Sequence, residues 1–382
     1  MLKPNFKLGI LGGGQLGKML IQAASKWDIK TYVLDPDKNC SSSVICNYFE
    51  EGSFKDYDTV YNFGKKVDIL TFEIEHVNTD ALKDLEKEGK IVFPQPNALE
   101  IIKDKGLQKE FYRENNIPTS KYHLFQSNEE ILSALNKNKL TLPFVQKSRT
   151  EGYDGKGVQT VKNEGDLTYL FNTPSLIEEL VSIEKELAVI VSRNSDGESI
   201  CFPTVEMEFS SDANLVEQLI CPSTITQEID ARAQQIAIDI INKLKMVGNL
   251  AVEFFLTKDG DLLVNEVAPR PHNSGHHTIE GNCTSQFEQH IRAILDMPLG
   301  DTSNKIAGVM VNLVGKEGYK GPVYYKNIEH ILAIEGVNPH IYGKKETRPF
   351  RKMGHITVIN KDLKLARKIA EQVKETIEVI SK

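Results

Sequence analysis

Two glutamates of this sequence predict a site for a divalent cation. Two strand-like segments flank Asp259-Gly260, a pair that favours a two-residue type I′ turn. Such a turn places Glu253 directly opposite Glu266, with both side chains on one face. Carboxylates about 5 Å apart repel by about 3 kcal/mol. Mg²⁺ relieves such repulsion and prefers one or two carboxylates plus phosphate oxygens, which fits this pair. Two glutamates on a solvated face beside basic residues are the alternative.

A glycine-rich loop predicts contact with phosphate groups. Arg149–Gly157 lies between two short segments with strand composition, and its glycines let backbone N–H groups approach a ligand. Lys147 and Lys156 would add positive charge. The loop is not a P-loop, because no Gly-Lys-Ser/Thr follows and it leads into a strand. A hairpin loop without a chemical role is the alternative, and Tyr153-Asp154 inside the glycines argues against it.

A second glycine run is typical of dinucleotide binding. Gly12–Gly17 follows a short apolar segment and opens a helical pattern, and Asp35 ends the next strand-like segment. In a dinucleotide-binding domain these backbone N–H groups face a pyrophosphate and the acid holds a ribose. A tight strand-to-helix turn without a dinucleotide is equally compatible with the pattern. An NAD-dependent dehydrogenase is therefore one hypothesis.

Two further segments favour a phosphorylated or polar ligand. The proline-rich loop 267–277 carries many hydrogen-bond donors, with Arg, His, Asn and Ser side chains, but its histidines lack the cysteine partners or spacing of a zinc site. A basic cluster follows nearer the end of the chain: Lys344, Lys345, Arg348, Arg351 and Lys352. A small anionic ligand fits this cluster, and a solvated loop is the alternative.

Composition limits the class of protein. The chain has 382 residues, 40% of them hydrophobic and 26% charged, which predicts two or three folded domains. Its net charge of −7, from 46 Lys+Arg and 53 Asp+Glu, disfavours non-specific nucleic-acid binding. Its apolar runs are too short to cross a membrane, and Met1–Leu11 has no signal-peptide character. Five cysteines without a CxxC pair suggest no disulfide framework. We expect a soluble, cytoplasmic protein.

The order of predicted elements indicates an α/β and α+β protein of three units. Four strands alternate with helices in the first hundred residues, which indicates a doubly wound parallel sheet. Strand pairs and one helix follow, and then a β-rich segment that ends in a helix from Asp362 with Leu365, Ile369, Val373, Ile377 and Ile380 on one face. The predicted strands and long central helix are Lys7–Leu11, Thr31–Leu34, Val67–Phe72, Lys90–Phe93, Pro143–Lys147, Val158–Val161, Asp230–Leu244, Leu250–Thr257, Leu262–Ala268, Val309–Val314 and Ile356–Ile359.

Taken together, these motifs resemble the ATP-grasp superfamily and, more narrowly, the N5-carboxyaminoimidazole ribonucleotide synthetase family. The segments that carry the resemblance are Gly12–Gly17, Phe72–Val77, Gly152–Gly157, Asn265–His276 and Arg348–His355. The resemblance covers nearly the whole chain. It implies an ATP-grasp fold with an N-terminal doubly wound domain (1–103), a central grasp domain (104–298) and a small β-rich C-terminal domain (299–382).

The resemblance also implies which residues bind ligands. Adenine would lie against Glu178–Val181, with Glu186 towards the ribose. The residues implied for ATP are Lys105, Lys147, Gly152, Tyr153, Asp154, Gly155, Lys156, Gly157, Val158, Glu178, Glu179, Leu180, Val181, Glu186, Asn265 and Glu266. Glu253 and Glu266 would hold Mg²⁺, for which Mn²⁺ could substitute. The residues implied for aminoimidazole ribonucleotide are Gln15, Leu16, Glu73, His76, Tyr153, Asp154, Arg270, His272, Asn273, Ser274, Lys344 and Arg351.

In such a family the reaction is an ATP-dependent carboxylation. Bicarbonate would take the γ-phosphoryl group of ATP, giving carboxyphosphate, and the ribonucleotide's amine would then capture the carboxyl group. Catalytic roles would fall to Tyr153, Asp154, Arg270, Lys344 and Arg351. A homodimer, functional coupling to a downstream mutase, and no nucleic-acid or membrane partner are implied as well. Other ATP-grasp ligases acting on a phosphorylated amine, and a non-catalytic nucleotide-binding relative, are alternatives within the superfamily.

This chain departs from the family's pattern at two points. Val158 stands where a glutamine often follows the last flap glycine, and Glu206–Phe209 stands where the family often has Glu-Asn-x-His. The side chain that the family places near ATP in the second segment is missing, so that contact is not carried over to this chain.

Overall fold

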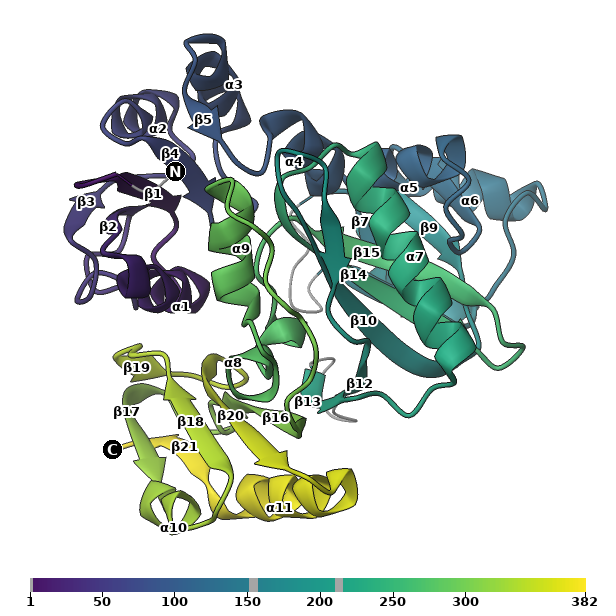
Figure 1. The fold of residues 1–382 in the computed structure, drawn as a ribbon. Coiled ribbons are helices and arrows are strands. Elements are labelled where there is room, and N and C mark those ends of the chain that lie inside the picture. Colours follow the sequence, from purple (N-terminus) through teal and green to yellow (C-terminus); the bar gives the residue numbers. More distant parts are fainter. Residues whose placement is uncertain (1–2, 151–156, 210–215) are drawn as a thin grey trace.

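The structure is a computed structural model, and it describes residues 3–150, 157–209 and 216–382 (Figure 1). Four sheets and the helices packed on them make up these parts of the chain. The mixed α/β and α+β architecture expected from the sequence is present.

The N-terminal sheet is parallel and has the strand order β3-β2-β1-β4-β5. The sequence prediction missed β3, which is short and half-exposed. Apolar side chains on β1 and β4 are buried on both faces, as expected for a parallel sheet between helices. The elements are β1 (Lys7–Leu11), α1 (Gln15–Ala24), β2 (Lys30–Asp35), β3 (Tyr48–Glu51), α2 (Tyr57–Gly64), β4 (Ile69–Phe72), α3 (Thr79–Lys87) and β5 (Ile91–Val92).

Two helices connect this sheet to the centre of the protein. Helix α4 (Pro96–Lys103) ends at Asp104, which is also the N-cap of α5 (Lys105–Glu114). Ala98 and Ile102 of α4 pack in the core of the central part, whereas Leu99 packs in the N-terminal core. Helix α4 therefore bridges the two cores, and the chain turns at Asp104 into α5.

A small antiparallel sheet follows, with the order β6-β9-β7-β8. It carries α6 on one side, around a core that includes Ile131, Phe144 and Ile177. Its elements are β6 (Tyr122–Phe125), α6 (Asn128–Asn136), β7 (Phe144–Ser148), β8 (Val158–Val161), a 3₁₀ turn (Glu164–Tyr169) and β9 (Ser175–Glu179).

The large antiparallel sheet runs from the centre into the C-terminal part without interruption. Its order is β15-β14-β10-β12-β13-β16-β20-β18, and β11 pairs with β10. The pairing of β13 with β16 joins the two parts, so the expected C-terminal unit is an extension of the central sheet. The strands are β10 (Ile183–Arg193), β11 (Ser199–Cys201), β12 (Val205–Phe209), β13 (Val216–Cys221), β14 (Gly248–Thr257), β15 (Leu262–Ala268), β16 (Ala307–Val314), β18 (Val337–Ile341) and β20 (Lys352–Asn360).

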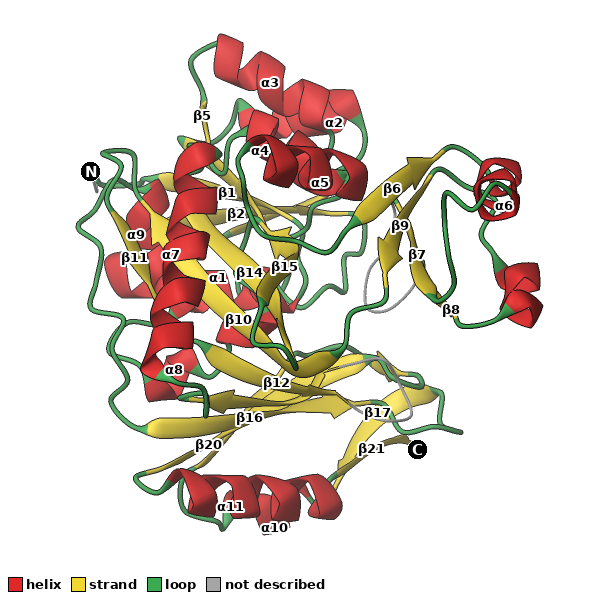
Figure 2. Ribbon diagram, turned by 90° about the vertical axis from the view of Figure 1, so that its right-hand side faces the viewer, coloured by secondary structure: helices red, strands yellow, loops and turns green. Residues whose placement is uncertain are grey.

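Helices cover this sheet at both ends, as Figure 2 shows. The long helix α7 (Gln227–Lys243) lies on β10 and β14, and α11 (Leu363–Thr376) lies on β16 and β20. Helix α9 (Gln286–Ile294) contacts β10 and β14 on one side and α1 on the other, and it completes the N-terminal core. The remaining elements are a 3₁₀ turn (Asn273–Gly275), α8 (Thr278–Gly281), β17 (Gly321–Lys326), α10 (Ile328–Leu332), β19 (Glu346–Thr347) and β21 (Glu378–Ser381).

The last helix is shorter than the sequence pattern indicated. Helix α11 ends at Thr376, and Ile380 belongs to β21, which pairs with β17. The prediction was wrong there because both residues fall at helical spacing, whereas Ile377 is the extended C-cap of α11 and Ile380 pairs with Tyr324 of β17. Across the three described stretches, no helix combines the length and apolar character needed to cross a membrane.

Candidate active site

The two glutamates predicted to pair do lie opposite each other. Glu253 on β14 is the register partner of Glu266 on β15. The predicted turn, however, was wrong: the Thr257 N–H donates to the Asp261 carbonyl at 2.8 Å, so the loop has three residues and Gly260 takes φ +85°. A β-bulge between this turn and Glu253 shifts the register back. The loop is one residue longer than predicted and the bulge adds one residue to β15, so the two shifts in register cancel.

The bulge gives two consecutive side chains access to one site. Asn265 is the residue without a register partner, and its Oδ1 accepts a hydrogen bond from Lys147 Nζ at 2.8 Å. Its neighbour Glu266 forms an ion pair with Lys105. In a regular strand adjacent residues face opposite sides, so the bulge is what lets both reach the lysines.

The carboxylates of this pair differ in their surroundings. The Lys105 ammonium lowers the pKa of Glu266 below its ordinary value. Burial, together with the charge of Glu266, raises the pKa of Glu253. The imidazole of His272 lies 3.6 Å from Glu253. A cation between these carboxylates would relieve the repulsion that the sequence predicted.

A second buried cluster holds Lys147. The Glu178 carboxylate lies 2.5 Å from Lys147 Nζ and 2.5 Å from Lys109 Nζ. Burial alone would raise the pKa of Glu178, but these two ammonium groups outweigh it and keep the carboxylate ionised. Ser120 donates to the same carboxylate. Sequence reasoning missed Lys109, because a lysine on an amphipathic helix carries no signal of the partner it meets.

The remaining residues expected around adenine lie at the end of β9, in the connection that follows it and on β10. The Glu178 side chain is committed to lysines, whereas Glu179 and Leu180 are exposed and Val181 is half-buried. Glu186 of β10 lies on the same face as Glu253, since Glu186 pairs with Phe255 and Ala188 with Glu253. Burial raises the pKa of Glu186 to about 7.

The glycine-rich loop leaves β7 and returns at β8. Gly152, Tyr153, Asp154, Gly155 and Lys156 lie outside the described residues, so their predicted contacts remain predictions. The two ends of the loop meet, because Ser148 N–H donates to the Gly157 carbonyl at 2.8 Å. Val158 is the register partner of Lys147, so the first residue after the loop lies directly beside that lysine.

The first glycine run is already bound to carboxylates of the protein itself. The N–H groups of Gly14 and Gly17 donate to the two oxygens of Glu73 at 2.9 and 3.3 Å, and Gly13 N–H donates to Asp35 at 2.7 Å. Burial raises the pKa of Glu73 to about 7. The donors that would hold a pyrophosphate are thus occupied, and this arrangement argues against the dinucleotide hypothesis. Gln15 and Leu16 begin the helix that follows.

The polar loop after β15 joins the N-terminal sheet to the C-terminal part. Arg270 lies 2.7 Å from the Glu75 carboxylate, and it acts electrostatically on Glu73. His272 Nδ1 lies 2.9 Å from the Ser274 hydroxyl. Asn273 exchanges two amide hydrogen bonds with Asn312 of β16, at 2.9 and 3.1 Å. The amide of Asn273 therefore fixes the loop against the large sheet. His76 follows the same N-terminal strand as Glu73.

The basic cluster lies at the edge of β20. Lys344 Nζ donates to the Lys352 carbonyl at 2.7 Å, and Arg351 Nη1 donates to the Glu346 carbonyl at 2.7 Å. Lys345 and Arg348 are exposed, whereas the other three are half-buried. Of the five, Lys352 acts electrostatically on Glu253 and lowers its pKa slightly against the effect of burial.

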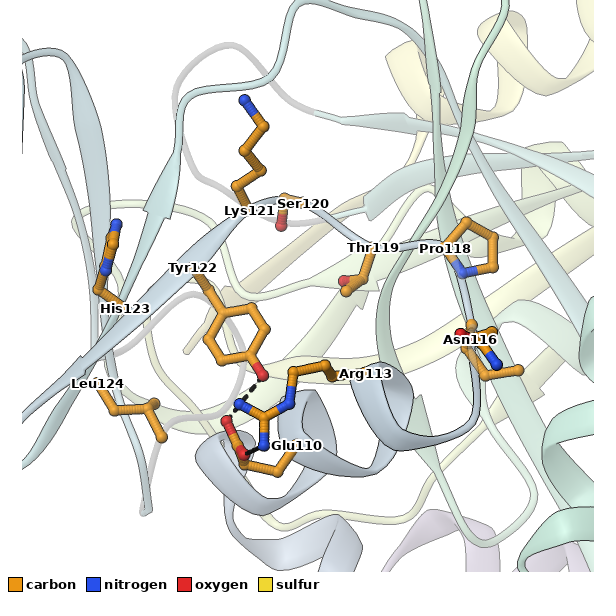
Figure 3. Close-up of a pocket in the computed structure, with 11 residues that line it drawn as sticks. Glu110, Arg113, Asn116, Pro118, Thr119, Ser120, Lys121, Tyr122, His123 and Leu124 are labelled. Carbon is orange, nitrogen blue, oxygen red and sulfur yellow. Dashed lines mark hydrogen bonds and ion pairs between the residues drawn. The ribbon is translucent and has the colours of Figure 1, made fainter.

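An open groove of about 710 Å³ lies outside this site (Figure 3). Residues of α5, β6 and the turn between them line it, and Tyr122 donates to Glu110 at 2.8 Å there. None of the predicted site residues lines the groove. Four of the predicted residues meet instead where α5 and β7 approach β15, namely Lys105, Lys147, Asn265 and Glu266.

The donor set fits a magnesium ion that also binds phosphate. Among the residues that the structure describes, no three His, Cys, Asp or Glu side chains form a metal-binding group. Glu253 and Glu266 alone therefore leave most coordination positions to water and substrate oxygens, which is the arrangement Mg²⁺ favours.

Comparison with known proteins agrees with this geometry. Three family models match successive parts of the chain: a ribonucleotide synthetase preATP-grasp domain (6–103), an ATP-grasp domain (110–287) and a phosphoribosylaminoimidazole carboxylase C-terminal domain (308–369). The fold and the site thus define an ATP-grasp enzyme, and the expected fold class is confirmed.

Individual relatives narrow the family. An N5-carboxyaminoimidazole ribonucleotide synthase of Bacillus subtilis is 37% identical over 94% of this chain and 92% of its own length. The crystal structure of an N5-carboxyaminoimidazole ribonucleotide synthetase from Thermotoga maritima is 44% identical, covers 99% of this chain and 100% of that one, and has a TM-score of 0.91. The chain belongs to the N5-carboxyaminoimidazole ribonucleotide synthase family, as its motifs predicted.

Two other relatives bear on ligands and length. The Aspergillus clavatus synthase, solved with ADP and 5-aminoimidazole ribonucleotide, is 32% identical over 97% of this chain and 98% of that one, with a TM-score of 0.89. A chloroplastic phosphoribosylaminoimidazole carboxylase of Vigna aconitifolia is 40% identical over 93% of this chain. The present chain spans 64% of that plant protein's length.

Proposed function

We propose that the protein catalyses the ATP-dependent carboxylation of 5-aminoimidazole ribonucleotide by bicarbonate. The products are N5-carboxyaminoimidazole ribonucleotide, ADP and phosphate, and the reaction belongs to de novo purine biosynthesis. The observation that carries the proposal is the convergence of Lys105, Lys147, Asn265 and Glu266, from two separate sheets and a helix, around the paired glutamates. The synthases among the relatives support the substrate.

ATP binds between the small sheet and the large sheet in this proposal. Lys105 and Lys147 contact its phosphates, the loop from Gly152 to Val158 covers them, and Glu178–Val181 with Glu186 lie at the nucleoside. Glu178 acts mainly through Lys147, because its carboxylate is already held by two ammonium groups. Glu253 and Glu266 hold Mg²⁺, which would neutralise charge on the transferred phosphoryl group; Mn²⁺ is a proposed substitute.

The ribonucleotide binds where the loop after β15 faces the N-terminal sheet. Gln15, Leu16, Glu73 and His76 contact it from the N-terminal side, and Tyr153 and Asp154 from the glycine-rich loop. Arg270, His272 and Ser274 contact it from the polar loop, and Lys344 and Arg351 bind its phosphate. Asn273 supports this loop through Asn312, and any direct contact requires its amide to leave that partner.

The chemistry needs positioned charge rather than a covalent nucleophile. A bicarbonate oxygen attacks the γ-phosphorus, ADP leaves, and carboxyphosphate forms. The ribonucleotide's amine nitrogen then bonds to the carboxyl carbon as the bond to phosphate breaks and the amine loses a proton. Lysine side chains stabilise the phosphoryl charge, and a closed site excludes water from the unstable intermediate.

Several coarser features accompany this proposal. A three-domain division at residues 103 and 298 is part of it, although the large sheet continues past the second boundary. A homodimer, a cytoplasmic location and coupling to a downstream mutase are also proposed. A bifunctional purine synthesis protein of Dictyostelium discoideum, of which the chain spans 37%, supports the idea of coupling to a neighbouring enzyme. Sedimentation analysis tests the dimer.

Phosphate release from Mg·ATP tests the function directly. The expected result is release that requires both 5-aminoimidazole ribonucleotide and bicarbonate, with a carboxylated product. Release that ignores the ribonucleotide would instead indicate another acceptor for the same fold. Absence of release under every condition would contradict the proposal.

A further inference from the structure

An ion pair at the root of the glycine-rich loop has no role in the proposed function. The Arg149 guanidinium contacts Asp104 with both arms, Nε to Oδ1 at 2.9 Å and Nη2 to Oδ2 at 2.7 Å. The two side chains are only 20% and 21% exposed. A bidentate contact of this kind fixes both distance and orientation.

Each partner is tied to a group that faces the candidate phosphate site. Asp104 is the N-cap of α5, where its Oδ1 accepts from Gly106 N–H at 2.7 Å, and Lys105 is the first residue of that helix. Arg149 is the first residue after β7 and stands two positions beyond Lys147. The backbone joins them too, since Lys105 N–H donates to the Arg149 carbonyl at 2.9 Å.

The helix is built to accept the guanidinium closely. A Cβ placed on Gly106 would lie 2.6 Å from Arg149 Nε and 2.9 Å from its Cζ. Only a glycine at this position leaves room for Arg149 against the first turn of α5. One turn further along the same helix face, Lys109 pairs with Glu178.

We propose that Arg149 and Asp104 are positioning residues for ATP, because their ion pair sets the separation between Lys105 on α5 and Lys147 on β7. This inference rests on the proposed function in one respect, which is that the nucleotide bound by these lysines is ATP. The proposed role needs no direct contact of the pair with ATP, because the pair fixes the two elements that carry Lys105 and Lys147. Its loss should weaken nucleotide binding and leave the ribonucleotide site unaffected.

Four variants separate this role from a general effect on folding. Arg149→Gln removes the charge, and Asp104→Asn removes the ion pair while keeping an N-cap acceptor for α5. The double variant joins both changes. Gly106→Ala displaces Arg149 without removing any charge, and alanine favours the helix. Arg292→Gln is the matched control, because Arg292 also makes two contacts to a carboxylate, Glu288, on α9.

The measurements are the Kd for Mg·ADP by calorimetry and the KM values for ATP and the ribonucleotide. We expect Arg149→Gln and Asp104→Asn each to raise the ADP Kd and the ATP KM about tenfold, with the ribonucleotide KM within about twofold. The double variant should be no weaker than the worse single variant. Gly106→Ala should weaken ADP binding with an unchanged or higher Tm, and Arg292→Gln should leave it unchanged.

Other outcomes would overturn the proposal. Unchanged ADP binding in both single variants, fully additive effects in the double variant, or an equal loss in Arg292→Gln would each remove the assigned role. ADP binding does not depend on the acceptor substrate. Wild-type protein that binds ADP without ribonucleotide-dependent phosphate release would therefore contradict the proposed function alone, and the variants would still test the ion pair.

Discussion

Two glycine-rich turns of this protein look alike in sequence and differ in the partners that bind the hydrogen-bond donors at each. At Gly12–Gly17 the backbone donors are bound by Glu73 and Asp35 of the same sheet. Before the second turn, Lys147 on β7 is held by Glu178 and Asn265. Fixed backbone donors stay with the carboxylates that match them, whereas a lysine side chain can exchange an amide oxygen for a phosphate. The difference teaches that glycine spacing predicts that another group can come close to the backbone. It does not predict whether that group is a carboxylate of the protein or a ligand.

The strongest test of this comparison removes the carboxylate at the second site. Glu266→Ala should lower ribonucleotide-dependent phosphate release by about 10³-fold or more, because a metal ligand is lost. The fold should persist, since Lys105 retains Glu178 and Glu253 nearby. Steady-state kinetics and circular dichroism check both points. Glu184→Ala, on an exposed position of β10, is the control, and full activity of Glu266→Ala would refute the metal assignment.

The next largest effect concerns stability. Glu178→Gln leaves Lys109 and Lys147 without their buried anion and should reduce the free energy of unfolding by about 3 kcal/mol. Urea denaturation measures this loss, and Glu179→Gln, at the exposed neighbour, should cost little. An unchanged stability would show that the two lysines find other partners.

The same residue predicts a pH dependence. Because the folded-state pKa of Glu178 lies below its ordinary value of 4.5, its contribution is present above that pH. It is lost as the pH falls below 4.5 towards the folded-state pKa. The difference in stability between wild type and Glu178→Gln should therefore shrink in that direction, and a difference that grows on acidification would contradict the assignment.

The basic cluster gives a smaller, substrate-specific effect. Arg351→Ala should raise the ribonucleotide KM about tenfold and leave the ATP KM nearly unchanged, since one charge-assisted contact to phosphate is lost. Arg348→Ala, which removes an exposed arginine of the same cluster, should change neither. Equal effects of Arg351→Ala on both substrates would count against its assignment.

The smallest effect should come from the first glycine turn. A Cβ on Gly14 would lie 2.7 Å from Glu73 Oε1, so Gly14→Ala should cost about 1 kcal/mol of stability while the ATP KM stays constant. Wild-type protein should also show no fluorescence transfer to NADH. Binding of NADH would break the comparison, because it would require Glu73 to yield these donors.

Local pattern predicted much of the fold. The strands Lys7–Leu11 and Val158–Val161 match their predicted bounds, because alternating or continuous apolar runs are set within a few residues. Errors arose where a partner distant in sequence decides the secondary structure. Residues of β3 form a strand because they pair with β2, and Ile380 lies in β21, which pairs with β17. The pairing of Glu253 with Glu266 was right although its turn was not, since the later bulge compensated.

The sequence by itself determined the family and which predicted strands and loops carry the candidate site residues. It also determined the presence of two carboxylates that need a cation. Only the tertiary structure decided which charges meet. Arg149 and Asp104 are 45 positions apart in sequence, and Lys109 and Glu178 are 69 positions apart. No local spacing therefore predicts either ion pair. Sequence patterns record which side of an element is buried. Ion pairs depend on how two elements approach, and that is settled only when the sheets and helices pack.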